Sequence, residues 1–278
     1  MQQDTTTNIN IKELLATKKP LFMGILNITP DSFSDGGKYF NLEDATKHAK
    51  ELIDKGVDII DIGGESTRPG ATPITEEEEL GRVIPVVEEI KHVSRAAINR
   101  GSTVLISIDT YKANVAQLAL NAGAQMINDV SGLTMDSKMV HVAAKANCPI
   151  VIMHNNGIPA TKPMSREDCR GRSVTCPADV LQDIFHWLQK QSQYAINHGI
   201  KKENIIIDPG IGFGKTAEED LLLIQNLKEF KSLGFPILIG PSKKSFIRKL
   251  FRENDFEEKN NELIKLSIEN GAAIVRVH

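Results

Sequence analysis

The sequence predicts a single (β/α)8 TIM barrel, and three observations support this prediction. The chain has 278 residues, of which 41% are hydrophobic, and this suits one large core of the usual barrel size. Eight short apolar runs bounded by turn residues recur along it, as buried parallel strands do. Amphipathic stretches long enough for helices lie between the runs, so strand and helix alternate. Eight such units suggest closure into a barrel, with a six-stranded open sheet as the alternative.

The predicted strands follow one another along the whole chain. They are Leu21–Ile28, Val57–Ile62, Val104–Ile108, Gln125–Asn128, Ile150–Met153, Ile205–Ile207, Ile237–Ile239 and Ala273–Val277. Two of the intervening helices start with a capping box, in which a Thr precedes a Glu by three residues: Thr75 with Glu78, and Thr216 with Glu219. The acidic run 76–79 is expected to be a solvated first helical turn, whose charge complements the helix dipole.

The domain organisation expected from these elements is simple. Residues 1–19 are expected to be a polar N-terminal extension, and residues 20–278 to form the barrel domain. The irregular stretch 155–178 is expected to be a lid or an insertion. The sequence stops at His278, directly after the last predicted strand, so the eighth helix of the repeating unit is missing and we expect a fragment. Such a fragment should expose an apolar groove lined by Leu21, Met23 and Val275.

Composition argues against several classes of function. The 33 Lys and Arg residues nearly balance the 36 Asp and Glu residues, so no broad basic surface is available for nucleic acid or an anionic membrane. The three cysteines are odd in number and lack metal-ligand spacing, which fits a reducing cytoplasm better than a disulfide framework. The polar start of the chain does not have the pattern of a signal peptide, and no run has membrane-spanning length. We therefore expect a cytoplasmic protein that acts on small molecules.

Polar or ionisable side chains follow every predicted strand, at the end where a barrel enzyme gathers its catalytic groups. Two long, glycine-bearing loops, residues 27–37 and 61–70, follow the first two strands. The later strand ends carry Asp109, Asn128 with Asp129, His154, Asp208, residues 242–245, and Arg276 with His278. A single one of these could be a helix cap or a turn residue. Eight coincident strand ends favour an active site, because a scaffold without one would avoid burying carboxylates near the barrel mouth.

The glycine-rich stretch 208–216 does not have the spacing of a nucleotide-binding loop. A P-loop needs a glycine where Pro209 stands, and the dinucleotide pattern needs one where Lys215 stands. We expect its glycines to let the backbone approach a flat ligand and the neighbouring strand.

At these residues the sequence resembles dihydropteroate synthase, a family of pterin-binding enzymes of folate biosynthesis. Four segments carry the resemblance in order, and weaker matches at 108–110 and 127–129 lie between them. The four are residues 24–37, 61–70, 208–215, and 242–246 before the final 276–278. The resemblance spans nearly the whole chain from about Pro20. It implies condensation of (7,8-dihydropterin-6-yl)methyl diphosphate with 4-aminobenzoate, release of diphosphate, and a requirement for Mg²⁺.

The resemblance implies a pterin site formed by Asp109, Asn128, Met153, Asp208 and Lys244. Asp208 would accept the paired N–H donors of the aminopyrimidine edge, and Asn128 would pair with the adjacent edge. Lys244 would donate to the ring acceptors, and Met153 would pack on the ring. Asp109 would face the positive charge that develops as the C–O bond to diphosphate breaks.

The resemblance also implies the other two parts of the site. The residues that bind diphosphate would be Asn27, Arg68, Arg276 and His278, with Asn27 also near the magnesium ion. The 4-aminobenzoate slot, which sulfonamides also occupy in the family, would be shaped by Phe33, Thr67, Pro69, Phe213 and Ser242. Asp109, Lys244 and Arg68 are the expected catalytic residues, because the chemistry needs support of a cation-like pterin and of the leaving group. The family also tends to form homodimers, which we expect here.

Two departures and two alternatives accompany this interpretation. Lys243 stands where the family usually has an arginine, so a planar or bidentate contact at that position is in doubt. The segment 154–157 also departs from the family pattern, and we expect no catalytic role for His154. A related methyltransferase barrel would bind a folate but has no need of the Arg68 loop. A pterin-binding regulatory module without turnover is the alternative of another class.

Overall fold

The computed structural model describes residues 11–17, 20–29, 42–68, 70–98, 104–158 and 180–278. Within them, eight parallel strands form one sheet in the order β6-β5-β4-β3-β2-β1-β8-β7, so neighbours in the sequence are neighbours in space. A bridge between Ile207 and Ile237 joins β6 to β7 and closes the sheet, and Ile207 N donates to Pro236 O at 3.0 Å. The predicted barrel is therefore confirmed, and the open sheet is excluded.

Each strand falls within or beside one of the predicted apolar runs. The strands are β1 (Leu21–Asn27), β2 (Ile59–Gly63), β3 (Leu105–Asp109), β4 (Met126–Asp129), β5 (Ile150–Met153), β6 (Ile205–Asp208), β7 (Leu238–Ile239) and β8 (Ile274–Val277). Most of their residues are fully buried because helices cover the outside of the barrel while side chains fill the inside.

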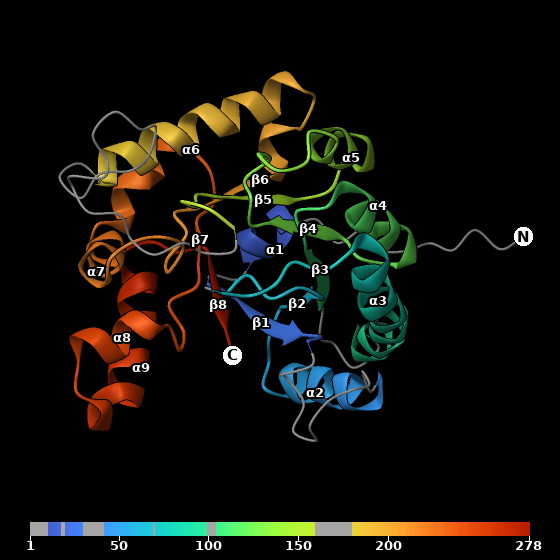
Figure 1. The fold of residues 1–278 in the computed structure, drawn as a ribbon, viewed down its shortest axis with the longest axis horizontal. Helices are drawn as coiled ribbons and strands as arrows, with labels where there is room; N and C mark the ends of the chain where they lie inside the picture. Colours follow the sequence, from blue (N-terminus) through green and yellow to red (C-terminus); the bar gives the residue numbers. More distant parts are fainter. Residues whose placement is uncertain (1–10, 18–19, 30–41, 69, 99–103, 159–179) are drawn as a thin grey trace, which may run out of the picture.

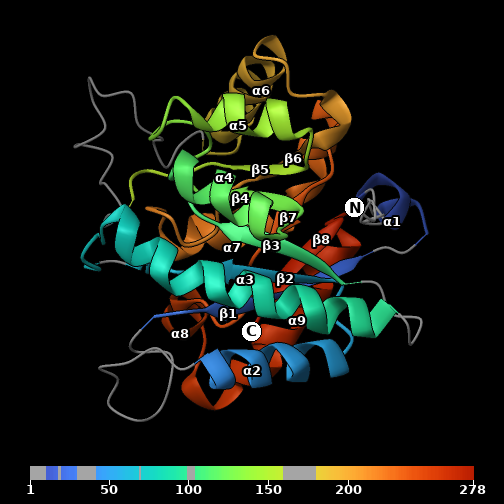
Figure 2. The same ribbon diagram turned by 90° about the vertical axis from the view of Figure 1, so that its right-hand side faces the viewer.

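Helices surround the strands as an outer ring (Figures 1 and 2). They are α2 (Leu42–Asp54), α3 (Glu76–Ile98), α4 (Ala113–Ala122), α5 (Met139–Ala146), α6 (Val180–Asn197), α7 (Ala217–Gln225), α8 (Ser245–Leu250) and α9 (Phe256–Glu269). Short 3-10 helices span Lys202–Asn204, Leu227–Leu233 and Glu253–Asp255. None of the described helices is long and apolar enough to cross a membrane.

Both predicted helix starts are found. At α7, Thr216 Oγ1 accepts from Glu219 N at 3.2 Å, and the Glu219 carboxylate accepts from Thr216 N at 2.7 Å, which completes the capping box. At α3, Thr75 Oγ1 accepts from Glu78 N at 3.2 Å, while the Glu78 carboxylate accepts from Arg82.

The inside of the barrel is apolar at the N-terminal ends of the strands. Inward side chains from all the strands meet there, and α1 (Ile11–Thr17) closes this end with Ile11 and Leu15, which are 1% and 6% exposed. Helix α1 lies inside the segment that the sequence analysis assigns to an N-terminal extension, yet it adds these two side chains to the core. Because apolar side chains fill the N-terminal end of the barrel, the polar side chains of the strand ends meet at the C-terminal end.

The expected apolar groove is not present at the residues proposed for it. Leu21, Met23 and Val275 are all fully buried. Leu21 and Met23 point into the barrel, where they pack with the α1 side chains. Val275 faces the layer between strands and helices and is packed there. That prediction is wrong because two of the three residues belong to the inner face of β1.

Candidate active site

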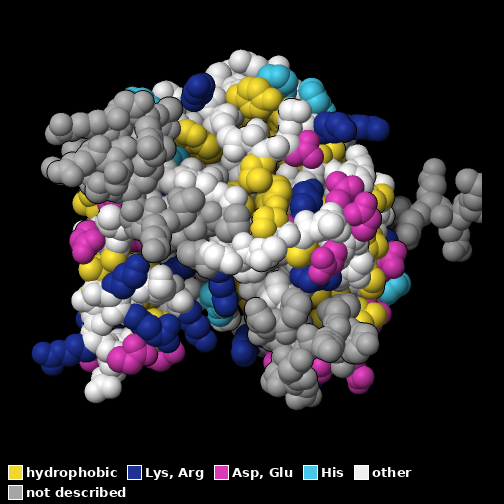
Figure 3. Space-filling model, viewed as in Figure 1, with side chains coloured by type: hydrophobic (Ala, Val, Ile, Leu, Met, Phe, Trp, Pro, Cys, Tyr) yellow, Lys and Arg dark blue, Asp and Glu magenta, His cyan; other side chains and the backbone are white. Residues whose placement is uncertain are grey.

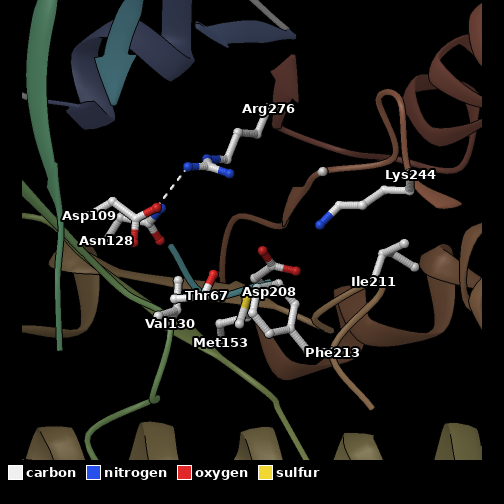
Figure 4. A pocket seen from close by; sticks show the side chains of 11 residues that line it. Thr67, Asp109, Asn128, Val130, Met153, Asp208, Ile211, Phe213, Lys244 and Arg276 are labelled. Atoms are coloured by element: carbon white, nitrogen blue, oxygen red, sulfur yellow. Dashed lines mark hydrogen bonds and ion pairs between the residues drawn. The ribbon is translucent and has the colours of Figure 1, made fainter. Parts of the chain in front are cut away.

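A cleft opens at the C-terminal ends of the strands, and eight of the predicted site residues line it (Figure 4). The eight are Thr67, Asp109, Asn128, Met153, Asp208, Phe213, Lys244 and Arg276. Three further lining residues were not singled out in the sequence: Val130, Ile211 and Gly240. They carry no polar side chain, so a search for reactive residue types passes over them.

The register of the parallel strands explains why residues so far apart in sequence meet here. Asn27 of β1 pairs with Gly63 of β2, Gly63 with Asp109 of β3, and Asp109 with Asn128 of β4. These positions form one level across four strands, with alternate side chains directed inward. Across the barrel, Met153 of β5 pairs with Asp208 of β6.

An ion-pair network occupies the centre of the site. Arg276 Nη2 donates to Asp109 Oδ2 at 2.7 Å, and Arg276 Nε donates to Asp61 Oδ2, also at 2.7 Å (Figure 4 shows the first). The same Asp61 oxygen accepts from Asn128 Nδ2 at 2.8 Å. Asp61 is fully buried, and the sequence analysis named it only as the first residue of the 61–70 loop, without a role of its own.

Two carboxylates of the site have raised pKa values. Burial raises the pKa of Asp208 to about 6, although Gly210 N donates to its Oδ1 at 2.7 Å and Lys244 and Lys215 lie near. Burial raises the pKa of Asp109 to about 7, with Arg276 opposing this shift and the Asp61 charge adding to it. Such shifts cluster at functional sites, where charged groups are kept out of water.

Two lysines lie near the cleft: Lys244 lines it, and Lys215 lies behind it in the glycine-rich loop. Lys244 Nζ lies 5.0 Å from the centre of the Phe213 ring, and burial together with the charge of Arg276 lowers its pKa to about 8. Lys215, which is 5% exposed, donates to Gly210 O at 2.7 Å and to His154 O and Phe213 O at 3.4 Å. Lys215 therefore holds the glycine-rich loop in place. The sequence analysis named Lys215 only as the residue that breaks the glycine spacing of a dinucleotide-binding loop.

Gly210 shows why this loop is rich in glycine. Its φ of +74° lies in the left-handed region, and a Cβ there would be 1.8 Å from His154 O. The loop thus lies directly against the end of β5, as the glycines predict. His154 itself is 3% exposed, packs edge-on against Trp187 and is not among the residues that line the cleft.

The loop after β2 is anchored by a buried ion-pair cluster, hereafter the Lys112 cluster, formed by Glu65, Glu79, Tyr111 and Lys112. Lys112 Nζ lies 2.6 Å from Glu65 Oε2 and 2.5 Å from Glu79 Oε2, and it also donates to Ile74 O at 3.0 Å. Tyr111 Oη donates to Glu65 Oε1 at 2.7 Å. Glu79 is 1% exposed, so the prediction that it belongs to a solvated turn is wrong.

The remaining predicted residues lie around the cleft. Asn27 Oδ1 and Asp109 Oδ2 are both 3.6 Å from the position that a Cβ atom would take at Gly63. Ser242 is buried at the start of the turn that carries Lys244, and Arg68 is exposed beside Thr67. Phe33 and Pro69, like most of the stretch 155–178, lie outside the described residues.

Positive charge gathers around the end of β8. Burial and the charges of Arg276, Lys244, Lys243 and Arg68 lower the pKa of His278 to about 4. Figure 3 shows several Lys and Arg side chains, with a His among them, on this side of the face that carries the cleft. An anion of high charge would be stabilised at this position.

Comparisons with known proteins agree with the geometry. The family model of pterin binding enzymes matches residues 23–278. The dihydropteroate synthase of Bacillus subtilis (strain 168) is 45% identical over 263 residues, covering 94% of this chain and 84% of the relative. The Xanthomonas albilineans enzyme in complex with 7,8-dihydropteroate has a TM-score of 0.75 at 34% identity, covering 93% of this chain and 87% of the related chain. The Yersinia pestis enzyme with a sulfonamide drug has a TM-score of 0.77 at 36% identity, covering 93% of this chain and 88% of the related chain.

Proposed function

The chain belongs to the dihydropteroate synthases of the pterin-binding enzyme family, and we propose how its barrel mouth performs their reaction. The reaction is a transfer that condenses (7,8-dihydropterin-6-yl)methyl diphosphate with 4-aminobenzoate in folate biosynthesis. It yields 7,8-dihydropteroate and releases diphosphate. The new bond joins the aryl amine nitrogen to the pterin methylene carbon, the bond to the diphosphate oxygen breaks, and the amine releases one proton.

The pterin ring would lie in the cleft between Asp208, Asn128 and Lys244, with Met153 packed against it. The observation that carries this assignment is Asp208, a buried carboxylate on the cleft wall whose pKa is raised by burial. Its oxygens suit the adjacent N–H donors of an aminopyrimidine. Lys244 supplies a donor for the ring acceptors across the cleft.

Asp109 would stabilise the pterin as the leaving group departs. Loss of diphosphate leaves positive charge on the pterin methylene and ring, and a carboxylate beside that charge lowers its energy. Arg276 contacts Asp109 in this structure and lies next to the other cations of the site. It can therefore contact the departing diphosphate while it stays near Asp109.

Diphosphate would be bound by Asn27, Arg68, Arg276 and His278, together with Mg²⁺. The Asn27 and Asp109 oxygens beside Gly63 fit a hard cation, which prefers oxygen ligands. Among the described residues, no group of three or more His, Cys, Asp or Glu could hold a metal alone. Mg²⁺ would therefore be held by Asn27 and the diphosphate oxygens, and when bound it would neutralise charge on the leaving group.

Thr67, Phe213 and Ser242, with Phe33 and Pro69 from outside the described residues, would form the 4-aminobenzoate slot. Thr67 and Phe213 both line the cleft, and the Phe213 ring lies 5.0 Å from Lys244 Nζ, which supports this assignment. A sulfonamide drug is bound in the related Yersinia pestis enzyme, so we propose that sulfonamides compete with 4-aminobenzoate here. We further propose a cytoplasmic homodimer, which rests on the cysteine pattern and the family resemblance.

The test of this function is a diphosphate-release assay with both substrates. We expect release only when the pterin diphosphate, 4-aminobenzoate and Mg²⁺ are all present, with 7,8-dihydropteroate formed in equal amount. Methyl transfer from a methylated folate instead would favour the methyltransferase alternative. Pterin binding without turnover would favour the regulatory module.

Dihydropterin affinity should depend on the ionisation of Asp208. Below a pH of about 6, protonated Asp208 offers fewer acceptor sites to the ring N–H donors, so the affinity should fall as pH decreases. Because Asp208 must give up one proton before the pterin binds, the affinity should fall roughly tenfold for each pH unit well below this pKa. Calorimetry between pH 8 and pH 5 measures this, and Asp208→Asn should remove the dependence. A flat profile for the unmodified chain would contradict the assignment.

Binding should be ordered, with 4-aminobenzoate following the anion. Arg68 is exposed here, so a bound diphosphate would draw it inward together with its neighbour Thr67, which forms part of the slot. We expect calorimetry to show measurable 4-aminobenzoate binding only after the pterin diphosphate, or diphosphate with Mg²⁺, has been added. Tight binding to the enzyme alone would rule this order out.

A further inference from the structure

Asp61 is the one fully buried carboxylate at the centre of the described site to which the proposed function gives no task. It lies on β2, two residues deeper in the barrel than the level of Asp109, and is 0% exposed. Two residues proposed to contact the substrate donate to it: Asn128 Nδ2 at 2.8 Å and Arg276 Nε at 2.7 Å. Both donate to the same oxygen, Oδ2.

The bond to Asn128 fixes which way that amide faces. A carboxylate can only accept, so the nitrogen of the Asn128 amide must be directed to Asp61. The amide oxygen is then on the other branch of the side chain, and Asn128 lines the cleft. Asn128 is thereby preset as an acceptor for a ring N–H, whereas an amide without this contact can rotate by half a turn.

The bonds to Arg276 fix the plane of its guanidinium. Nε contacts Asp61 and Nη2 contacts Asp109, so two carboxylates on neighbouring strands hold two edges of one planar group. Arg276 is held in this position because its charge is compensated by these two carboxylates. Without Asp61 only the contact to Asp109 is left.

Resting on the proposed function, we infer that Asp61 is a positioning residue of the pterin site. Its Oδ2 orients the Asn128 amide toward the pterin ring and holds the Arg276 guanidinium in place for the diphosphate. It acts through these two residues, and so it should alter pterin binding without contacting the pterin itself.

The second oxygen of Asp61 makes it possible to test the orienting contacts of Asp61 separately from its negative charge. Oδ1 is buried and has no hydrogen-bond partner among the described residues. In Asp61→Asn the amide oxygen can take the place of Oδ2 and keep both acceptor contacts, while the NH₂ group takes the place of Oδ1, where no donor is displaced. Asp61→Ala removes both contacts. Comparison of the two variants therefore tests orientation.

The experiment measures binding of 6-hydroxymethyl-7,8-dihydropterin by calorimetry and the Asn128 side-chain amide signal by NMR. Asp61→Ala should weaken pterin binding by about 10- to 100-fold, the usual effect of losing hydrogen bonds to a charged group. Asp61→Asn should bind within about threefold of the unmodified enzyme, because the acceptor is restored. The Asn128 amide signal should move in Asp61→Ala and stay close to its original position in Asp61→Asn.

The matched control is Asp58→Asn, a buried carboxylate near the other end of β2 whose Oδ2 accepts from Phe22 N at 2.9 Å. It should leave pterin binding and the Asn128 signal unchanged. Equal pterin affinity of Asp61→Ala and the unmodified enzyme, with only a lowered melting temperature, would reduce Asp61 to a structural residue and overturn the inference. Equal losses in Asp61→Asn and Asp61→Ala would also overturn it. Failure of the unmodified enzyme to bind pterin would instead count against the proposed function.

Discussion

Replacement of Asp208 by Asn is expected to weaken dihydropterin binding by about 100- to 1,000-fold and to leave the barrel folded. Gly210 N donates to Asp208 Oδ1 at 2.7 Å, and this donor selects the orientation of the new amide. The amide oxygen must face Gly210, so the NH₂ group faces the cleft. There it meets the N–H donors of the aminopyrimidine, so a donor faces a donor where a carboxylate oxygen accepted before.

The control for this variant is Asp220→Asn. Asp220 is also buried, its pKa is also raised to about 6 by burial, and its Oδ1 accepts from another glycine of the same loop, Gly212, at 2.8 Å. It is not among the residues that line the cleft, so its replacement should change pterin affinity only slightly. Calorimetry on both variants, with thermal melting to confirm folding, decides the matter. An Asp208→Asn affinity within a few-fold of the original would remove Asp208 from the ring-binding role.

The sequence predicts the strand-end residues well because a barrel places the residues after all of its strands at the same end. Asp109, Asn128 and Asp208 each follow an apolar run, and parallel strands in a closed barrel bring the residues after such runs to one mouth. Periodicity and residue type therefore suffice to place them on the cleft, without knowledge of any single contact. Their roles toward substrate come from the family resemblance and stay predictions.

The sequence does not reveal side chains whose role depends on a distant partner. In the sequence, Asp61 is only a polar residue within an apolar run. Its role depends on Arg276, which lies 215 residues later and donates to it in the structure. Glu79 stands in an acidic run that begins a helix, and such a run is normally solvated. Its burial follows from Lys112, which reaches it from the next βα unit, and no local pattern encodes that pairing. The proposed groove at Leu21 and Met23 failed similarly, because the inner face of β1 was taken for the outer one.

The Lys112 cluster leads to the second large expected effect. Lys112→Met should destabilise the fold by about 3–5 kcal/mol, because it leaves two buried carboxylates without their shared cation. Glu65 and Glu79 have side chains that are only 4% and 1% exposed, so water cannot replace the lost ammonium group. Lys259→Met is the control: its partner Glu262 is at a similar distance of 2.7 Å but 53% exposed, and the melting temperature should barely change.

The destabilisation of Lys112→Met should also depend on pH and on Glu79. Burial already raises the pKa of Glu79 against the opposing contact with Lys112, so without the lysine the pKa should rise further. Acidification then protonates Glu79 and removes the buried charge, and the difference in unfolding free energy from the unmodified enzyme should shrink as pH falls. Adding Glu79→Gln should restore part of the stability at neutral pH. Denaturant unfolding of the single and double variants between pH 5 and pH 8 measures both effects. A difference that stays constant with pH, or a double variant less stable than Lys112→Met, would show that the lysine stabilises this loop by packing and not by compensating the buried carboxylates.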